Sequence, residues 1–221
     1  MTLSKTAHIG RILGTPVSML TPVDSSVYVL LIGEAPGPRG ADKSGVPFFG
    51  DAAGKVLYDV LVRIGAMTLP AAIDRMEWDG ALFVANGIVP LAHGVALGNA
   101  FDRCPTDDGA TFRAPLRSEL EGTSNLARLT RDITTLRTRG LKGIVTLGRV
   151  ATRTIDMLYK RTPMPEVARC ALPHPSAQGL LSMAPDRGKG AKMADLQEAW
   201  MVRCQNAVVQ AGFPSPTAAQ S

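Results

Sequence analysis

Two short segments of the chain concentrate residue types that bind ligands and exchange protons. The first is Gly33–Gly50, GEAPGPRGADKSGVPFFG, which has five glycines, three prolines and an acid, Glu34, at its second position. Glycine lets a backbone approach a ligand closely and proline stiffens the approach, so this composition favours a preformed binding loop. The second is Pro173–Ser176, PHPS, in which His174 lies between two prolines. A histidine in that setting is a poor core residue, so we interpret the two segments as parts of one site.

Two other interpretations of Gly33–Gly50 are open. A phosphate-binding loop is one, but the pattern GxxxxGK[ST] is absent from the chain, and the segment is too long and too rich in proline for a dinucleotide-binding turn. A tight connection without a role is the other. Because functional residues concentrate on loops held by a rigid scaffold, a binding role is favoured over both.

The elements that must position these segments begin with β-strands. Four short apolar runs predict strands, at Val27–Ile32, Ala81–Ala85, Gly143–Leu147 and Arg169–Leu172. Their apolar character is continuous rather than alternating, which is typical of strands covered on both faces in a parallel sheet.

Helical patterns lie between the predicted strands. Strands that alternate with helices predict an α/β protein of three layers, α/β/α, with a central four-stranded, mostly parallel sheet. The stretch Leu91–Glu121 has weak periodicity and is expected to be a long loop or an insertion. The expected helices are one capped by Asp51 and running to about Ile64, one capped by Ser124 and ending before Gly140, one over about Val150–Tyr159, and one over about Ala194–Ala211.

Residues able to bind a ligand follow the ends of the predicted strands. Glu34 follows the first, Asn86 the second, Gly148 the third and His174 the fourth. The carboxyl ends of parallel strands share one edge of an open sheet, and ligands bind at that edge. Residues some 140 positions apart are therefore expected to converge on one cleft.

Composition limits the class of protein. The chain has 221 residues, 45% hydrophobic and 19% charged, which predicts one domain over residues 1–212 with a flexible tail over 213–221. It has no apolar stretch of bilayer length and no secretory signal, so a monomeric cytoplasmic protein is expected. The net charge of +5 is too mild to establish a nucleic-acid partner. Three widely spaced cysteines without a CxxC pair argue against a zinc ribbon or an iron–sulfur cluster.

Several of these motifs together resemble the uracil-DNA glycosylase superfamily, most closely its families four and five. Gly33–Gly37 and Gly45–Gly50, followed by a helix, resemble the first motif of that superfamily. Gly143–Ala151 resembles its third strand and the helix after it, and Pro173–Ser176 resembles its second signature motif. The resemblance covers roughly residues 27 to 200, with the motifs in the correct order.

The resemblance implies a monofunctional DNA glycosylase that hydrolyses the N-glycosidic bond of uracil, or of a related deaminated base, and leaves an abasic site without a metal or cofactor. The implied catalytic residues are Glu34, which would stabilise the developing cation or position water, and His174, which would donate a hydrogen bond to the departing uracil. The implied base-binding residues are Ala35, Phe48, which would stack on the flipped base, and Asn86, which would bond its Watson–Crick edge. Such an enzyme must flip its target base out of the duplex.

The partner implied is uracil-containing DNA, in a protein associated with the nucleoid. The residues implied to contact the DNA are Ser176, Gln178, Arg187 and Lys189, the last two in a basic stretch that also holds Lys192. The side chain that would enter the duplex is one of three, Gln178, Leu180 or Leu181.

Departures from the superfamily's motifs leave the base specificity open. Relatives have a water-activating aspartate where this chain has Ala35, a thymine-blocking tyrosine where it has Gly37, and a second acid where it has Gly40. The iron–sulfur cysteines of family four are missing. A glycosylase for hypoxanthine or xanthine is therefore one alternative. A non-catalytic or covalent uracil-DNA-binding protein is another, although His93 lacks the arginine-rich surroundings of the covalent branch, and a nucleotide-binding protein is disfavoured by the missing phosphate loop.

Overall fold

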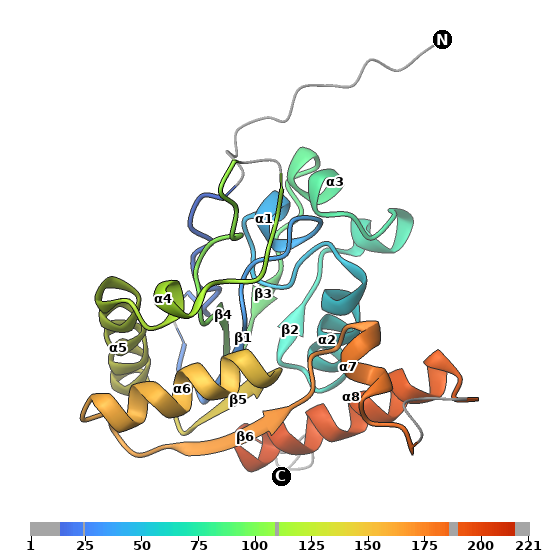
Figure 1. The fold of residues 1–221 in the computed structure, drawn as a ribbon. Helices are drawn as coiled ribbons and strands as arrows, with labels where there is room; N and C mark the ends of the chain where they lie inside the picture. Colours follow the sequence, from blue (N-terminus) through green and yellow to red (C-terminus); the bar gives the residue numbers. More distant parts are fainter. Residues whose placement is uncertain (1–13, 24, 109–110, 186–189, 215–221) are drawn as a thin grey trace.

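The computed structural model describes residues 14–23, 25–108, 111–185 and 190–214. Its centre is a four-stranded sheet in the order β4-β1-β5-β6, in which every neighbouring pair is parallel (Figure 1). The strands are β1 Val29–Gly33, β4 Val95–Asn99, β5 Gly143–Leu147 and β6 Ala168–Leu172. The predicted α/β class and four-stranded sheet are confirmed, and the predicted runs at β1, β5 and β6 match to within two residues.

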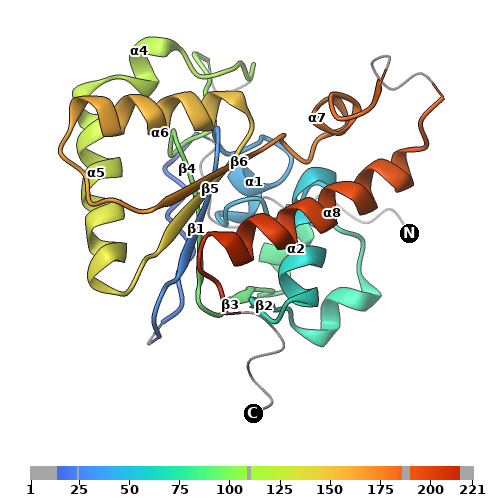
Figure 2. The same ribbon diagram turned by 90° about the horizontal axis from the view of Figure 1, so that it is seen from below.

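Side chains of β1 alternate between two apolar layers, which shows how the sheet is covered. Val29 and Leu31 pack in a cluster with residues of α2 (Ala52–Arg63) and α8 (Met193–Gln210). Leu30 and Ile32 pack in a second cluster with residues of α5 (Thr123–Thr138) and α6 (Arg149–Arg161). Figures 1 and 2 show the two helix pairs on opposite faces of the sheet. Because consecutive side chains of a strand point to opposite faces, this pattern produces the predicted three layers.

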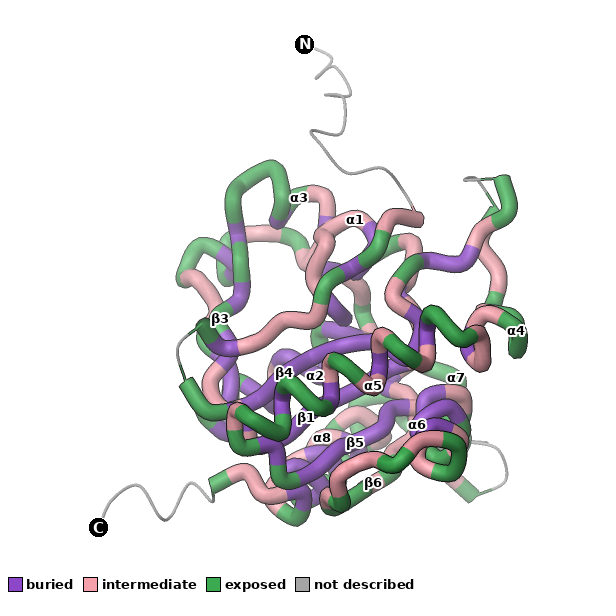
Figure 3. The backbone as a smooth tube through the Cα atoms, turned by 90° about the vertical axis from the view of Figure 1, so that its left-hand side faces the viewer, coloured by how far each residue is buried: buried purple, intermediate pink, exposed green. Residues whose placement is uncertain are grey.

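Burial follows the same layers. Every residue of β1, β4 and β5 is buried, whereas β6 at the edge of the sheet is largely exposed (Figure 3). α5 shows buried and exposed residues in alternation along its length, as expected of a helix with one apolar stripe. The remaining elements are short: α1 Ala41–Ser44, β2 Met67–Thr68, η1 Ala71–Arg75, α3 Gly80–Ala85, β3 Leu91–Ala92, α4 Arg117–Leu120 and α7 Ala177–Leu181.

Helix boundaries show which caps the sequence revealed. The predicted cap of α2 is confirmed, because Asp51 Oδ1 accepts a hydrogen bond from Gly54 N at 2.7 Å. Its end is also close to prediction, with Gly65 in the left-handed region at φ 73°. The predicted cap of α5 is wrong, since this helix begins at Thr123 with Gly122 as its N-cap residue. The bounds of α6 and α8 differ from prediction by one or two residues.

The predicted strand at Ala81–Ala85 is wrong, because this run forms helix α3. The side chain of Asp79 caps the helix by accepting from Ala81 N at 2.8 Å and Leu82 N at 3.0 Å. Only Gly80 and Phe83 are buried in α3, at the three-residue spacing of a helix with one inward face. A strand of the central sheet would be covered on both faces.

The stretch Leu91–Glu121 is not the long loop that was expected. It contains β3, which pairs antiparallel with β2, and β4, which pairs with β1 along its whole length. Leu20 and Leu97 exchange two backbone hydrogen bonds of 2.9 Å on the other side of β4. The run VALGN is short and contains alanine and glycine, both weak strand formers, so its burial between β1 and Leu20 decides its conformation.

The described part of the C-terminal end can be compared with the expected start of the tail at residue 213. Phe213, the first residue of the expected tail, packs against the cluster that contains α8, and its N–H bonds Val208 O at 3.1 Å. Residues 215–221 lie outside the described part. None of the described helices is long and apolar enough to cross a membrane.

Candidate active site

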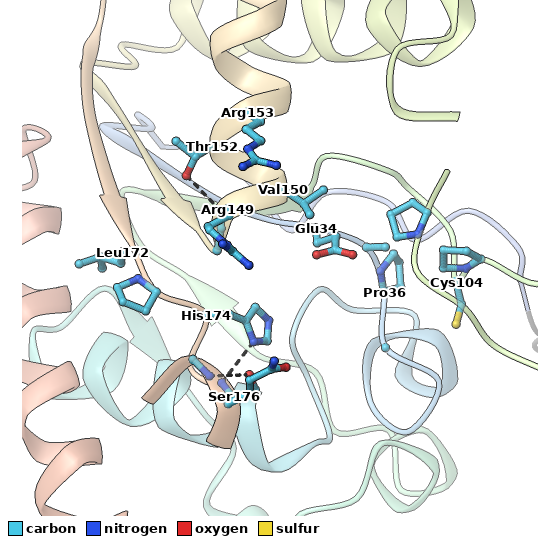
Figure 4. Close-up of a pocket in the computed structure, with 18 of the residues that line it drawn as sticks. Glu34, Pro36, Cys104, Arg149, Val150, Thr152, Arg153, Leu172, His174 and Ser176 are labelled. Carbon is cyan, nitrogen blue, oxygen red and sulfur yellow. Dashed lines mark hydrogen bonds between the residues drawn. The ribbon is translucent and has the colours of Figure 1, made fainter. Parts of the chain in front are cut away.

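A cleft of about 970 Å³ lies at the carboxyl edge of the sheet (Figure 4). Its lining comes from the loops that follow β1, β5 and β6 and from a segment beyond β4, Cys104–Pro115. Glu34, Gly148 and His174 all line it, so three of the four strand-end residues singled out by sequence converge as expected.

The loop that carries His174 is held from two sides. On one side, Trp200 Nε1 of α8 donates a hydrogen bond to Pro173 O at 2.9 Å. On the other, α7 approaches so closely that a Cβ on Gly179 would lie 2.0 Å from His174 O. Gly148, with φ 94°, leaves similar room beneath the histidine, since its Cβ would lie 3.3 Å from His174 Cβ. Glycine at both positions is what allows the imidazole to sit at the end of β5.

The hydrogen bonding of His174 fixes its tautomer. Its Nδ1 accepts a hydrogen bond from Ser176 N at 3.2 Å, which requires this nitrogen to be unprotonated and places the proton of the neutral ring on Nε2. Burial lowers the pKa of His174 below its ordinary value of 6.5, an effect opposed by the charge of Asp51. The imidazole is therefore neutral at neutral pH and offers Nε2–H as a donor.

Glu34 enters the cleft directly after β1. Its backbone is clamped to the end of β4, because Phe101 N donates to Glu34 O at 2.9 Å and Ala100 N donates to Gly33 O at 2.8 Å. The side chain is half-buried, and burial raises the pKa of this carboxyl above its ordinary value of 4.5. A carboxylate in such a poorly solvated position interacts strongly with any positive charge that develops nearby.

The ring of Phe48 lies against the end of β1. A Cβ on Gly33 would be 2.6 Å from Phe48 Cζ, so glycine at position 33 makes room for the aromatic ring. Phe48 is the non-glycine residue with a positive φ, 61°, among those that the structure describes. This conformation is costly for a bulky residue, and it clusters at functional sites. The close packing of Gly54 against Phe48 O and the hydrogen bond from Tyr58 OH to Pro47 O hold it in place.

Asn99 meets Phe48 at the same point. It is the last residue of β4, and its Oδ1 lies 3.1 Å from the Cβ position of Gly33. The side chain is 5% exposed, yet its buried Nδ2 has no hydrogen-bond partner in the structure. Its backbone is fixed, since Arg128 Nη2 donates to Asn99 O at 3.1 Å. A buried donor without a partner costs about 1–3 kcal/mol, which a ligand acceptor would recover.

Comparison with known proteins now places the chain. A model of the uracil DNA glycosylase superfamily matches residues 22–200. The chain belongs to this superfamily. A curated relative, the type-5 uracil-DNA glycosylase of Thermus thermophilus, is 40% identical over 50 residues, which is 23% of this chain and 23% of the relative. The chain is also similar to the solution NMR structure of a candidate uracil DNA glycosylase from Methanosarcina acetivorans, with 14% identity, a TM-score of 0.41, and coverage of 89% of this chain and 98% of the other.

Asn86, the asparagine predicted from the sequence to bind the base, lies away from the cleft. Asn86 does not follow a strand; it is the exposed C-cap residue of α3, and its Nδ2 donates to Leu82 O of its own helix at 2.8 Å. It does not line the cleft, and neither do Phe48 and Asn99, which are 7% and 5% exposed and lie against Gly33 at the end of β1. Asn99 occupies the strand-end position that the sequence analysis assigned to Asn86. An asparagine directly after the apolar run Val95–Gly98 was the available signal.

The other predicted contacts fall into three groups. Ala35 lines the cleft and packs against the small cluster of Ala100, Phe101 and Leu120. Ser176 and Gln178 also line it, and Ser176 Oγ caps α7 by accepting from Gly179 N at 3.4 Å. Arg187 and Lys189 lie outside the described residues.

Burial reduces the three candidates for the side chain that would enter a duplex. Leu180 is 1% exposed and packs in the core, so it is not free to do so. Leu181 is half-buried and does not line the cleft, whereas Gln178 is exposed and does. Gln178 therefore remains as the candidate on α7.

Asp51 places a carboxylate beside two glycines of the loop after β1. While Oδ1 caps α2, Oδ2 lies 2.7 Å from the Cβ position of Gly40 and 3.2 Å from that of Gly37. Its charge acts on His174, whose pKa it raises against the larger effect of burial. From the sequence, Asp51 was expected only to cap a helix, so its effect on His174 was missed.

No cluster of three or more histidine, cysteine or acidic residues able to hold a metal ion occurs in the described part of the chain. The cysteines are free, and burial raises the pKa of Cys104 and of Cys204 to about 12, with the charge of Asp42 adding to the effect at Cys104. These two thiols are therefore protonated at neutral pH.

Proposed function

We propose that this superfamily member is a monofunctional DNA glycosylase that hydrolyses the N-glycosidic bond of uracil, or of a related deaminated base, in DNA and leaves an abasic site. The observation that carries the proposal is the buried, unpartnered Nδ2 of Asn99 beside the ring of Phe48. An amide and an aromatic face held together at a sheet edge suit a flat base with polar edges. Membership of the superfamily and the short match to a type-5 enzyme support the same function.

The amide of Asn99 is complementary to the Watson–Crick edge of uracil. That edge presents O4 as an acceptor and N3–H as a donor, so Asn99 Nδ2 would donate to O4 while Oδ1 accepts from N3–H. Cytosine presents the reverse pattern, with an exocyclic amine as donor and N3 as acceptor. An asparagine that presents its amide in this orientation would therefore favour uracil over cytosine.

Bond cleavage creates negative character on the departing base and positive character on the sugar. His174 is suited to the first, because its neutral ring holds a proton on Nε2 that can hydrogen-bond the uracil oxygen O2. Glu34 is suited to the second, since its half-buried carboxylate would stabilise a cationic sugar or position the attacking water. Preorganised groups of this kind are usually the largest contribution to such catalysis.

The alternatives from the sequence differ in support. The covalent branch would need His93 at the cleft, but this histidine does not line it, and its Nε2 is 2.8 Å from Oγ1 of Thr68 at the antiparallel pair of β2 and β3. Hypoxanthine and xanthine keep a carbonyl next to a ring N–H, which Asn99 would also pair with. Base preference among deaminated bases is thus the part of the proposal that the experiment must resolve.

The test is an excision assay with labelled oligonucleotides that contain uracil, hypoxanthine, xanthine or a thymine mismatch, single- and double-stranded, followed by alkaline cleavage of abasic sites. We expect cleavage of uracil DNA. Tight retention of uracil DNA without cleavage of any substrate would refute the enzyme, and a protein–DNA band that survives denaturant would indicate the covalent alternative.

A further inference from the structure

One half of the cleft is lined by Arg149 and Arg153 of α6 and by Phe112 and Arg113 of the segment that follows β4. The residues assigned to the flipped base, Phe48 and Asn99, do not line the cleft. Neither the base-reading nor the bond-breaking groups use this half of the cleft. Its four side chains are two unpaired cations, an aromatic ring and a third cation that is already paired.

Arg149 and Arg153 have no part in holding the fold together. Both are exposed, and neither forms a hydrogen bond or ion pair with any residue that the structure describes. Arg149 is the first residue of α6, where the helix dipole disfavours positive charge, and Arg153 lies one turn further along. Their four-residue spacing places them on one face of the helix, and Figure 4 shows both beside the open part of the cleft. Two cations kept at an unfavourable place and facing a cleft indicate an anionic ligand.

Phe112 lines the cleft beside residues that backbone pairing and ion pairs hold in place. It is half-buried and belongs to none of the three apolar clusters of the described residues. A backbone bridge pairs it with Thr106. The next residue, Arg113, forms ion pairs of 2.8 Å with Asp107 and with Glu119 of α4.

Arg113 has a structural role, whereas Arg149 and Arg153 on α6 are available to bind a ligand. The carboxylates of Asp107 and Glu119 match the charge of Arg113, whereas Glu34, the acid among the described residues that line the cleft, is half-buried directly after β1. The uncompensated positive charge of the cleft is therefore on Arg149 and Arg153, in the same cleft as an aromatic ring. This combination is the usual composition of a subsite for single-stranded nucleic acid.

We propose that this half of the cleft is a second nucleotide subsite, in which Phe112 stacks on an unpaired base next to the flipped one and Arg149 and Arg153 bind two successive phosphates. The subsite rests on the proposed function for its position beside the target base. Stacking on Phe112 requires a base that is free of its partner strand, so the chain binds single-stranded DNA more tightly than duplex DNA.

The test measures the fluorescence anisotropy of a labelled oligothymidylate without uracil, alone and annealed to its complement, so that binding is separated from excision. We expect Phe112→Ala and Phe112→Leu to weaken single-strand binding by about tenfold, while Phe112→Tyr retains it, because stacking needs an aromatic face rather than apolar volume. Thermal unfolding of each variant reports whether the turn still folds.

The electrostatic half of the subsite is tested by the salt dependence of the same binding. For the double variant Arg149→Gln, Arg153→Gln, the slope of log K against log salt is expected to flatten by about 1.4, since each phosphate neutralised on a single strand contributes about 0.7. Lys160→Gln removes an exposed cation from the last turn of the same helix and serves as the matched control, with an unchanged slope.

Equal binding of single strand and duplex, or unchanged single-strand affinity in Phe112→Ala, overturns the subsite. Excision of uracil from the same preparations is measured separately with enzyme in excess. Excision by the wild-type protein together with normal binding by all variants refutes the subsite and leaves the proposed function standing. Weakened binding by the variants without any wild-type excision refutes the function and leaves the subsite standing.

Discussion

The run Ala81–Ala85 and the run Val95–Gly98 are both short and apolar, and each is followed by an asparagine. The first forms α3, with Leu82 and Val84 about 40% exposed, and its asparagine bonds its own helix in solvent. The second forms β4, fully buried beside β1, and its asparagine is enclosed with an unused donor. The amide of Asn86 already donates a hydrogen bond within the protein, so a ligand would add little to it. The buried Nδ2 of Asn99 has no hydrogen-bond partner, so a ligand acceptor would satisfy it. The environment of the two asparagines, rather than their type, therefore separates a capping residue from a binding residue.

The largest effect is expected for Asn99→Ala. Loss of one preorganised donor typically lowers the rate by about a hundredfold to a thousandfold, so uracil excision under single-turnover conditions should fall by that amount. Because Nδ2 has no partner in the free protein, the substitution removes no hydrogen bond of this group, and the free energy of unfolding should not fall by more than about 1 kcal/mol. A large loss of stability with little loss of excision would show that Asn99 is a structural residue. Asn99 would then not differ from Asn86 in binding a ligand.

The next effect in size is that of His174→Ala, which should lower excision by about a hundredfold through loss of the Nε2 donor. Since burial holds the pKa of His174 below 6.5, the imidazole is neutral above that pH and wild-type activity should be level there. As the pH falls further, the ring gains a proton and activity should decline. This decline should be absent from the pH–rate profile of the variant, and its persistence would assign it to another group.

A smaller loss, about tenfold, is expected for Glu34→Gln, because the amide keeps the shape of the side chain and removes its charge. Burial raises the pKa of Glu34 above 4.5, so the wild-type carboxyl loses its charge as the pH falls toward that raised value. The variant should lack the part of the acid limb due to Glu34. An unchanged rate and profile would show that the carboxylate does not act on the sugar.

The smallest effect is expected for Asn86→Ala, whose excision rate should stay within about twofold of wild type. The residue is exposed and outside the cleft, so only the hydrogen bond to Leu82 O is lost, at a cost of about 1 kcal/mol or less in unfolding free energy. A loss of excision comparable to that of Asn99→Ala would restore Asn86 as the base-reading residue and refute the comparison.

How much the sequence predicted depends on whether local or tertiary interactions decide each element. β1, β5 and β6 are continuous apolar runs, and the cap of α2 needs only Asp51, so these features were predictable. Glu34 and His174 followed from strand ends and were brought to one cleft. β4 was not predictable, because Ala96 and Gly98 carry little strand preference and their conformation depends on pairing with β1.

Two further features of the candidate site could not be predicted from the sequence, because they also depend on tertiary structure. Asp51 Oδ2 lies beside Gly37 and Gly40 only because neither residue carries a side chain, and this contact requires the fold of the whole loop. Arg149, Arg153 and Phe112 become one surface only when α6 and the segment after β4 face each other. Side-chain types were visible in the sequence, but the distance between elements was not.

The hydrogen bond from Trp200 Nε1 to Pro173 O makes the fluorescence of Trp200 a reporter of the loop that carries His174. The indole is fully buried in α8 and is coupled through one residue to His174, so its emission wavelength and quenching depend on the polarity and position of that loop. Trp78, the other tryptophan of the chain, packs among Phe49, Tyr58 and Phe83 behind α2. With Trp78 replaced by phenylalanine, the fluorescence of Trp200 alone would follow occupation of the cleft in real time, without a label on the protein or on its ligand.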